Sequence, residues 1–188
     1  MRCSIILQLF AMVCLALTLT ASHLSAKSPP QAGDSVEDVL TFNFPIPTVE
    51  EHRVHLNLAD GRETVSLKDM GKAYLLVEIV GVYCPVCHNQ APQVLRLYQR
   101  VQRDPGLADK LGMVAIAAGA TPMEVEHLHR TWRFPFPILQ DGDYALHKLV
   151  GEPDTPFAFI VDRDGVVLYA RVGRIDPDNL FNQLTKLP

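Results

Sequence analysis

Two segments of the chain are apolar almost without interruption, residues 74–80 (YLLVEIV) and 113–118 (MVAIAA). A strand with one exposed face alternates apolar and polar side chains, whereas a strand covered on both faces is apolar throughout. Both segments are therefore predicted to be strands buried in a sheet. Between them, apolar side chains recur at helical spacing over residues 91–101, which predicts a strand–helix–strand unit.

The second half of the chain continues to alternate helices and strands. Residues 121–132 begin with Thr-Pro, a pair that favours the first positions of a helix. Residues 136–139 (FPIL) form a short strand candidate, and residues 143–149 form a short helix candidate. This pattern predicts that the sheet continues beyond the first unit.

Two hairpins and a final helix complete the pattern. Residues 157–161 and 166–170 are apolar, and the turn sequence DRDG between them predicts a β-hairpin. Upstream, residues 54–58 (VHLNL) and 64–67 (TVSL) predict a smaller hairpin, and residues 176–186 predict the last helix. The fold class is therefore α/β: a three-layer sandwich with a mixed central β-sheet and an N-terminal β-hairpin extension.

Residues 1–26 have the pattern of a secretory signal peptide. Arg2 precedes an apolar run over residues 5–17, and small or polar residues follow up to Ala26. The run is shorter than the roughly 20 apolar residues that cross a bilayer, so cleavage after Ala26 is preferred and a retained anchor is the alternative. The sequence thus predicts export to a bacterial periplasm and one domain over residues 27–188.

Cleavage of the signal peptide would leave Cys84 and Cys87 as the only cysteines. A zinc site with four cysteines is then excluded, and a single close pair is unlike the framework of a disulfide-stapled domain. A net charge of −4, with no cluster of Lys and Arg, argues against a nucleic-acid partner. The pair is therefore predicted to carry out chemistry rather than to hold the fold.

Cys84 directly follows the first buried strand, and Pro85 suits the first position of the helix that comes next. Unpaired backbone N–H groups and the helix dipole favour an anion at this helix N-terminus, so a thiolate at Cys84 is expected. Cys87 lies one turn further into the helix. Cys84 is therefore predicted to attack, and Cys87 to resolve the resulting mixed disulfide.

The order strand, C-P-x-C, helix, with Thr155-Pro156 before a later β-hairpin, resembles the thioredoxin-like superfamily. It is most similar to exported TlpA-type and redoxin thiol-disulfide oxidoreductases, over roughly Gly33 to Leu187. The resemblance implies a thioredoxin-like fold and an enzyme that uses neither cofactor nor metal. Tyr83 stands where the family commonly has Trp, and the inner dipeptide (PV) leaves the direction of electron flow open.

Glu78 stands six residues before Cys84, where thioredoxins place a buried acid beneath the dithiol. Burial disfavours a charged carboxyl, so the pKa of Glu78 is expected to be raised. The resemblance implies that this group takes the proton from Cys87 as Cys87 attacks the mixed disulfide. A carboxylate at a strand edge, with no catalytic part, is the alternative.

The remaining residues implied by the resemblance lie around the dithiol. Thr155-Pro156 matches the cis-proline loop of the family, which offers backbone groups to the substrate chain. Tyr83 and Pro85, on either side of Cys84, are the other predicted substrate-binding residues. The implied partners are proteins with thiols or disulfides, such as an apocytochrome c or another exported oxidoreductase, and a membrane-bound dithiol electron donor.

Three other functions compete with this interpretation. C-x-x-C-H is also the attachment motif of a c-type haem, with His88 as an axial ligand. Otherwise His88 is expected to be solvated, with stabilisation of the Cys84 thiolate by a protonated His88 as the alternative. A peroxiredoxin-like peroxidase would need Thr or Ser at position 81 and Pro at position 77, where the chain has Gly81 and Val77. Copper could bind Cys84, Cys87 and a His, but exported copper chaperones of this fold leave three residues between their cysteines.

Overall fold

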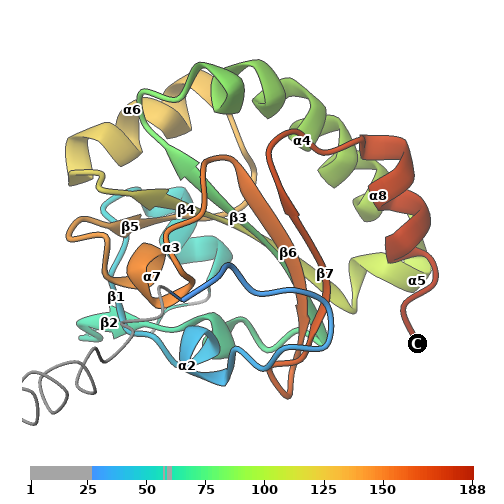
Figure 1. Ribbon diagram of the computed structural model, residues 1–188. Helices are drawn as coiled ribbons and strands as arrows, with labels where there is room; N and C mark the ends of the chain where they lie inside the picture. Colours follow the sequence, from blue (N-terminus) through green and yellow to red (C-terminus); the bar gives the residue numbers. More distant parts are fainter. Residues whose placement is uncertain (1–26, 57, 59–60) are drawn as a thin grey trace, which may run out of the picture.

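The computed structural model describes residues 27–56, 58 and 61–188, and the predicted signal peptide lies outside them. Five strands form the central sheet in the order β5-β4-β3-β6-β7 (Figure 1). They are β3 (Tyr74–Gly81), β4 (Leu111–Ala118), β5 (Ile138–Asp141), β6 (Phe157–Asp162) and β7 (Val167–Val172). The predicted α/β class with a mixed sheet is confirmed, because β3, β4 and β5 run parallel while β6 and β7 pair antiparallel.

Strand β3 lies at the centre of this sheet and carries the dithiol at its end. It pairs with β4 from Tyr74↔Leu111 to Gly81↔Ala118, and on its other side with β6 as far as Ile79↔Phe157. The apolar runs seen in the sequence are buried on both faces, as expected for strands of a sheet that is covered by other elements on both faces.

Three helices cover one face of the sheet: α4 (Pro85–Arg103), α6 (Pro122–Trp132) and α8 (Pro177–Leu184) (Figure 1). The short α5 (Pro105–Ala108) follows α4. Helix α4 turns an apolar stripe toward the strands, so Val94, Leu97 and Val101 are buried in the same cluster as Leu76 and Val80 of β3. Glu78 lies between Leu76 and Val80 in the strand, so its side chain points to this same face.

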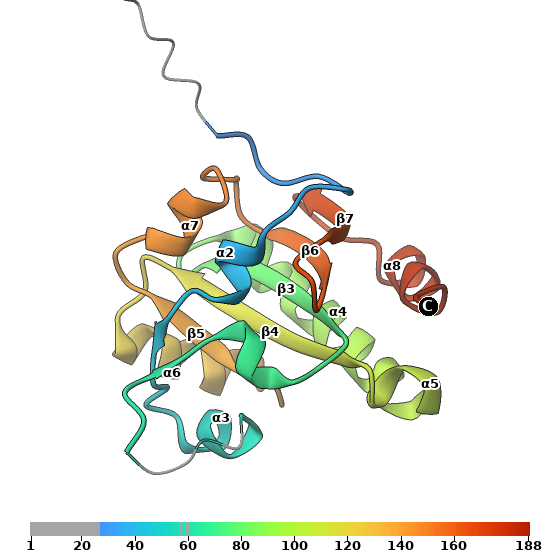
Figure 2. The same cartoon turned by 90° about the horizontal axis from the view of Figure 1, so that it is seen from below.

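The other face is covered by smaller elements: α2 (Glu37–Leu40), the 3-10 helix η2 (Leu67–Met70) and α7 (Ala145–Leu149). Leu75, Val77 and Ile79 of β3 pack here, which completes the three layers. Figure 2 shows α2 and α7 on the same side of the strands.

The upstream extension is a two-stranded antiparallel sheet of β1 (Phe44–Pro45) and β2 (Thr64–Val65). A hairpin extension and its second strand are therefore confirmed, but the predicted first strand at 54–58 is wrong. That stretch begins inside helix α3 (Glu50–His55). Its alternation of apolar and polar side chains is too short to separate strand from helix, and Val54 is 70% exposed rather than packed on a sheet.

Among the described residues, no helix combines the length and apolar character that crossing a membrane requires.

Candidate active site

The two cysteines occupy the start of α4 as predicted. Cys84 is the N-cap residue, its backbone is extended, and Pro85 is the first helical residue. The backbone N–H of Cys87 points at Sγ of Cys84, 3.1 Å away. The two sulfurs form a disulfide, with the Cα atoms 5.3 Å apart. Cys84 is partly exposed whereas Cys87 is 2% exposed, so only Cys84 can be reached by a partner protein.

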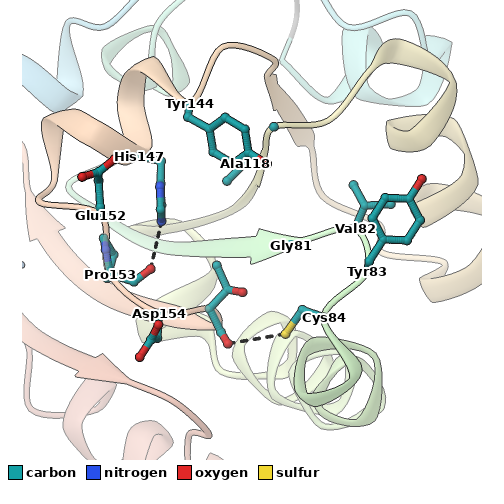
Figure 3. A pocket seen from close by; sticks show the side chains of 12 residues that line it. Gly81, Val82, Tyr83, Cys84, Ala118, Tyr144, His147, Glu152, Pro153 and Asp154 are labelled. Atoms are coloured by element: carbon teal, nitrogen blue, oxygen red, sulfur yellow. Dashed lines mark hydrogen bonds between the residues drawn. The ribbon is translucent and has the colours of Figure 1, made fainter.

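The Thr155–Pro156 loop lies against Cys84. Sγ of Cys84 is 3.4 Å from the carbonyl oxygen of Thr155, although the two residues are 71 positions apart in the chain (Figure 3). The Thr155–Pro156 peptide bond is cis, which confirms the prediction from the sequence. The loop leads directly into β6, beside β3, and this pairing brings the loop to the dithiol.

A cleft of about 380 Å³ opens beside Cys84 and Thr155 (Figure 3). Tyr83 borders it on one side and is 83% exposed. Tyr144, Glu152 and Asp154 border it on another side, and all three are exposed. None of the twelve described residues that line the cleft is Lys or Arg, so its charged side chains are carboxylates.

Tyr144 is held in the cleft wall by an unusual backbone. Its φ is 57°, a conformation that costs a non-glycine residue free energy. Tyr144 is also the N-cap residue of α7. Gly119 makes room for the ring: a Cβ at Gly119 would lie 2.0 Å from a ring carbon of Tyr144. Glu152 also has a positive φ of 53°. Two of the three such non-glycine residues in the described chain therefore line this one cleft.

Glu78 is buried, as predicted, with 6% of its surface exposed, and its carboxyl contacts Gln90, three positions after Cys87 in α4. Burial raises its pKa to about 7, and a hydrogen bond from Gln90 opposes the rise. Nε2 of Gln90 donates to Oε1 of Glu78 at 2.6 Å, and Oε1 of Gln90 accepts from the backbone N–H of Ile175 at 2.8 Å. The carboxyl is therefore poised to gain or lose a proton near neutral pH.

Tyr83 is tied to helix α6. Its hydroxyl donates to Oε1 of Glu124 at 2.5 Å, while Oε2 of Glu124 accepts from the hydroxyl and the backbone N–H of Thr121. The hydrogen bond from Tyr83, followed by those from Thr121, lowers the pKa of Glu124 to about 2. The same contact with Glu124 raises the pKa of the Tyr83 phenol. The exposed ring next to Cys84 is thus fixed by an ionised carboxylate.

His88 is not merely solvated, and that expectation is wrong. Its Nε2 lies 2.8 Å from the carbonyl oxygen of Val82, and its Nδ1 accepts from the indole N–H of Trp132 at 3.0 Å. The reason is long-range: α6 brings Trp132 against the first turn of α4, which the sequence does not reveal. Both ring nitrogens face protein partners, so His88 does not fit the role of a haem ligand.

The described residues also fail to gather a copper site. They contain no group of three His, Cys, Asp or Glu side chains placed to hold a metal ion. His147 lines the cleft, but its Nε2 is 2.9 Å from the carbonyl oxygen of Pro153. The ring of His129 packs against the ring of His52, with 4.7 Å between the ring centroids.

Four residues of the site escaped the sequence analysis: Gln90, Glu124, Tyr144 and Glu152. Gln90 follows Cys87 by three positions, so it shares the inner face of α4, and this spacing is a signal that sequence analysis could have used. Glu124 contacts Tyr83, and Tyr144 and Glu152 line the cleft, so all three come to the site only through the fold.

A dithiol at the N-terminus of a helix, reached from a central strand and flanked by a cis-proline loop, defines a thioredoxin-like thiol-disulfide oxidoreductase. The mixed five-stranded sheet around it is the corresponding fold. Residues 31–184 match the Redoxin family model. The chain belongs to the Redoxin family.

Individual relatives are distant. The thiol-disulfide oxidoreductase ResA of Bacillus thuringiensis subsp. konkukian is 24% identical over 123 residues, which are 65% of this chain and 68% of ResA. The fold is similar to that of a secreted Mycobacterium tuberculosis disulfide oxidoreductase homologous to E. coli DsbE, with a TM-score of 0.59 and 17% identity over 81% of this chain and 100% of that one. It is also similar to the Xanthomonas campestris bacterioferritin comigratory protein, which has alkyl peroxide reduction activity, with a TM-score of 0.58 and 11% identity over 83% and 98%.

Proposed function

We propose that this protein is an exported thiol-disulfide oxidoreductase that reduces or exchanges disulfides in periplasmic proteins. The observation that carries the proposal is the unequal exposure of the dithiol: Cys84 opens into a cleft beside Thr155, while Cys87 is buried behind it. The signal-peptide pattern of residues 1–26 supports export, as does the likeness to a secreted oxidoreductase.

The first step is the attack of the Cys84 thiolate on one sulfur of the partner's disulfide. A bond forms between Cys84 and that sulfur, the partner's S–S bond breaks, and the other sulfur leaves as a thiolate. Backbone N–H groups at the start of α4, that of Cys87 among them, stabilise the attacking anion. The partner is then held by a mixed disulfide.

The second step releases the partner. Glu78 takes the proton of the Cys87 thiol, and the Cys87 thiolate attacks Sγ of Cys84. The bond between Cys84 and the partner breaks, so the partner leaves with both sulfurs reduced and the Cys84–Cys87 disulfide forms. A membrane-bound dithiol donor then returns two electrons to this disulfide by the same exchange in reverse.

The cleft supplies contacts for the partner chain. The carbonyl oxygen of Thr155 lies 3.4 Å from the reactive sulfur, and Tyr83 lines the same cleft. Pro85, which follows Cys84 at the start of α4, and Pro156 of the cis-proline loop are the other contacts that we propose. An extended segment of the partner that pairs with the backbone at Thr155 places its own sulfur beside Cys84.

A peroxidase is the main competing enzyme, because the fold alone is shared with a protein that reduces alkyl peroxides. Gly81 argues against it: a Cβ at this position would lie 3.2 Å from Oγ1 of Thr155 and 3.3 Å from Cβ of Cys84. The site thus has little room for the hydroxyl side chain that binds peroxide. Val77, at the position of the required Pro, is packed in the core on the far face of the sheet.

An equilibrium redox titration of the protein, starting from the Cys84/Cys87 disulfide, tests the proposal. A potential near that of thioredoxin, roughly −270 mV, is expected for a reductant, whereas roughly −120 mV indicates a disulfide donor. Turnover of an alkyl peroxide without a reversible dithiol couple would instead support the peroxidase, and cysteines already bound to haem or copper would support those alternatives.

A further inference from the structure

Gln90 is a polar side chain with no exposed surface. It lies on the inner face of α4, one turn after Cys87, and both ends of its amide are hydrogen-bonded to groups that are themselves buried. A buried amide that lost either partner would carry a free-energy cost of about 1–3 kcal/mol, so the arrangement is strongly constrained.

The partners fix the orientation of the Gln90 amide. The backbone N–H of Ile175 can only donate, so it must face the amide oxygen, 2.8 Å away. The NH₂ group of Gln90 is then turned toward Glu78 and can only donate to it, at 2.6 Å. Gln90 therefore presents a fixed donor to the Glu78 carboxyl, a contact that favours the ionised form of the acid.

The same chain of contacts reaches the loop beside Cys84. Residues 173–175 run from β7 toward α8 and pass next to α4 (Figure 1). At the start of this segment, the backbone N–H of Gly173 donates to the carbonyl oxygen of Pro156 at 2.7 Å. At its end, Ile175 anchors Gln90. One three-residue segment thus connects the cis-proline loop to the buried acid through hydrogen bonds.

We propose that Gln90 is a positioning residue for proton transfer, which holds the Glu78 carboxyl in a fixed orientation beneath the dithiol, with residues 173–175 tying that orientation to the Thr155–Pro156 loop. The inference rests on the proposed function, in which Glu78 accepts the proton of Cys87. Without the Gln90 amide, no hydrogen bond opposes the rise in the pKa of Glu78 that burial causes, and the carboxyl can rotate away from its position.

Gln90→Met keeps the shape and length of the side chain but removes both hydrogen bonds. The exposed Gln99 on the same helix provides the matched control, Gln99→Met. The mixed disulfide between Cys84 and a peptide is prepared for each protein, and its rate of resolution by Cys87 is followed from pH 5 to 9. The pH midpoint of Glu78 is measured in parallel from the carbon-13 shift of its carboxyl group.

For the wild type we expect resolution to accelerate with pH around the midpoint of Glu78. In Gln90→Met the midpoint should move up by about one pH unit, so that resolution at neutral pH slows about fivefold while the rate at pH 9 returns to the wild-type value. Gln99→Met should change neither quantity. A merely structural role for Gln90 would slow resolution equally at every pH and leave the midpoint unchanged, and that result would overturn the inference.

Further measurements distinguish the positioning role of Gln90 from the proposed proton transfer by Glu78. In a Glu78→Gln background, Gln90→Met should add no further slowing, because the two residues act as a unit. If Glu78→Gln does not change the rate at which Cys87 resolves the mixed disulfide, Glu78 has no role in proton transfer. Resolution that depends on Glu78 but is unshifted by Gln90→Met overturns only the positioning role. If Gln90→Met fails to fold, Gln90→Asn, which is too short to reach both partners, takes its place with the same expected shift.

Discussion

The indole N–H of Trp132 donates a hydrogen bond to Nδ1 of His88, 3.0 Å away and 44 positions earlier in the chain. Nε2 on the other side of the ring lies 2.8 Å from the carbonyl oxygen of Val82. The imidazole therefore ties the backbone two residues before Cys84 to helix α6.

Replacing His88 with Phe removes both of these hydrogen bonds and leaves the indole N–H and the Val82 carbonyl without their partner. We expect the free energy of unfolding to fall by about 1–3 kcal/mol. Urea denaturation measures the change. His127→Phe, on the exposed side of α6, is the control and should be close to neutral. Equal stability of the two variants would show that the two hydrogen bonds contribute nothing.

Cys87→Ser should trap partner proteins, because the mixed disulfide at Cys84 then has no resolving thiol. A periplasmic extract separated under non-reducing conditions should show adducts that disappear with reductant. Cys84→Ser is the matched control and should trap nothing, since Cys87 is 2% exposed. Adducts formed equally by both variants would contradict the assigned order of attack.

Glu78→Gln should slow the release step by about a hundredfold above pH 7 and leave the first attack nearly unchanged, because only release requires the proton acceptor. Stopped-flow measurement of each step separates the two. Equal slowing of attack and release would remove the proposed role.

Glu78 also makes stability depend on pH. Below its ordinary pKa of 4.5 the carboxyl is protonated in both folded and unfolded chains. As the pH rises from 4.5 to about 7, the unfolded chain ionises while the folded chain stays neutral, so stability falls across this window. Glu78→Gln should remove that part of the slope in denaturation measured at pH 5, 6 and 7.

The carboxylates of Glu152 and Asp154 predict a charge preference for the partner. Peptide disulfides with Lys beside the cysteine should be reduced faster than the same peptides with Glu, and the difference should shrink as salt is added. Glu152→Gln combined with Asp154→Asn should abolish the preference. Asp164→Asn, in the β6–β7 turn at the other end of the sheet, should retain it.

His52 should limit stability in acid. It is 1% exposed, and neither ring nitrogen has a hydrogen-bond partner among the described residues. Burial, followed by the nearby His129, lowers its pKa to about 4, so the unfolded chain takes up a proton below pH 6.5 that the folded chain does not. His52→Leu should raise the free energy of unfolding at pH 5 by about 1 kcal/mol or more in urea titrations. His127→Leu should not.

Local sequence rules were sufficient for the centre of the site. The apolar run at 74–80 predicts β3, the Cys-Pro pair predicts the start of α4, and the position of Glu78 inside the apolar run favours its burial. Each of these inferences uses residues within one element and its immediate neighbours. The cis state of Thr155–Pro156 came from resemblance rather than from its residues alone.

Long-range contacts were beyond these rules. The spacing of Gln90 from Cys87 indicates that it faces inward, but not that Glu78 of β3 and Ile175 of the segment before α8 are its partners. The strand predicted at 54–58 was wrong for a local reason: five residues with alternating polarity are too few to distinguish a strand from a helix. Phe44–Pro45 was missed as a strand because it is only two residues long and contains proline.

The central position of β3 determines how easily this strand unfolds locally. Its backbone is paired with β4 on one side and with β6 on the other, whereas β5 and β7 are the open edges of the sheet. Such an inner strand exchanges its amide hydrogens only when the whole domain opens, while edge strands and short helices fray locally. Cys84 is attached directly beyond this strand. The protein can therefore make and break its sulfur–sulfur bonds repeatedly at the tip of the segment that is last to loosen.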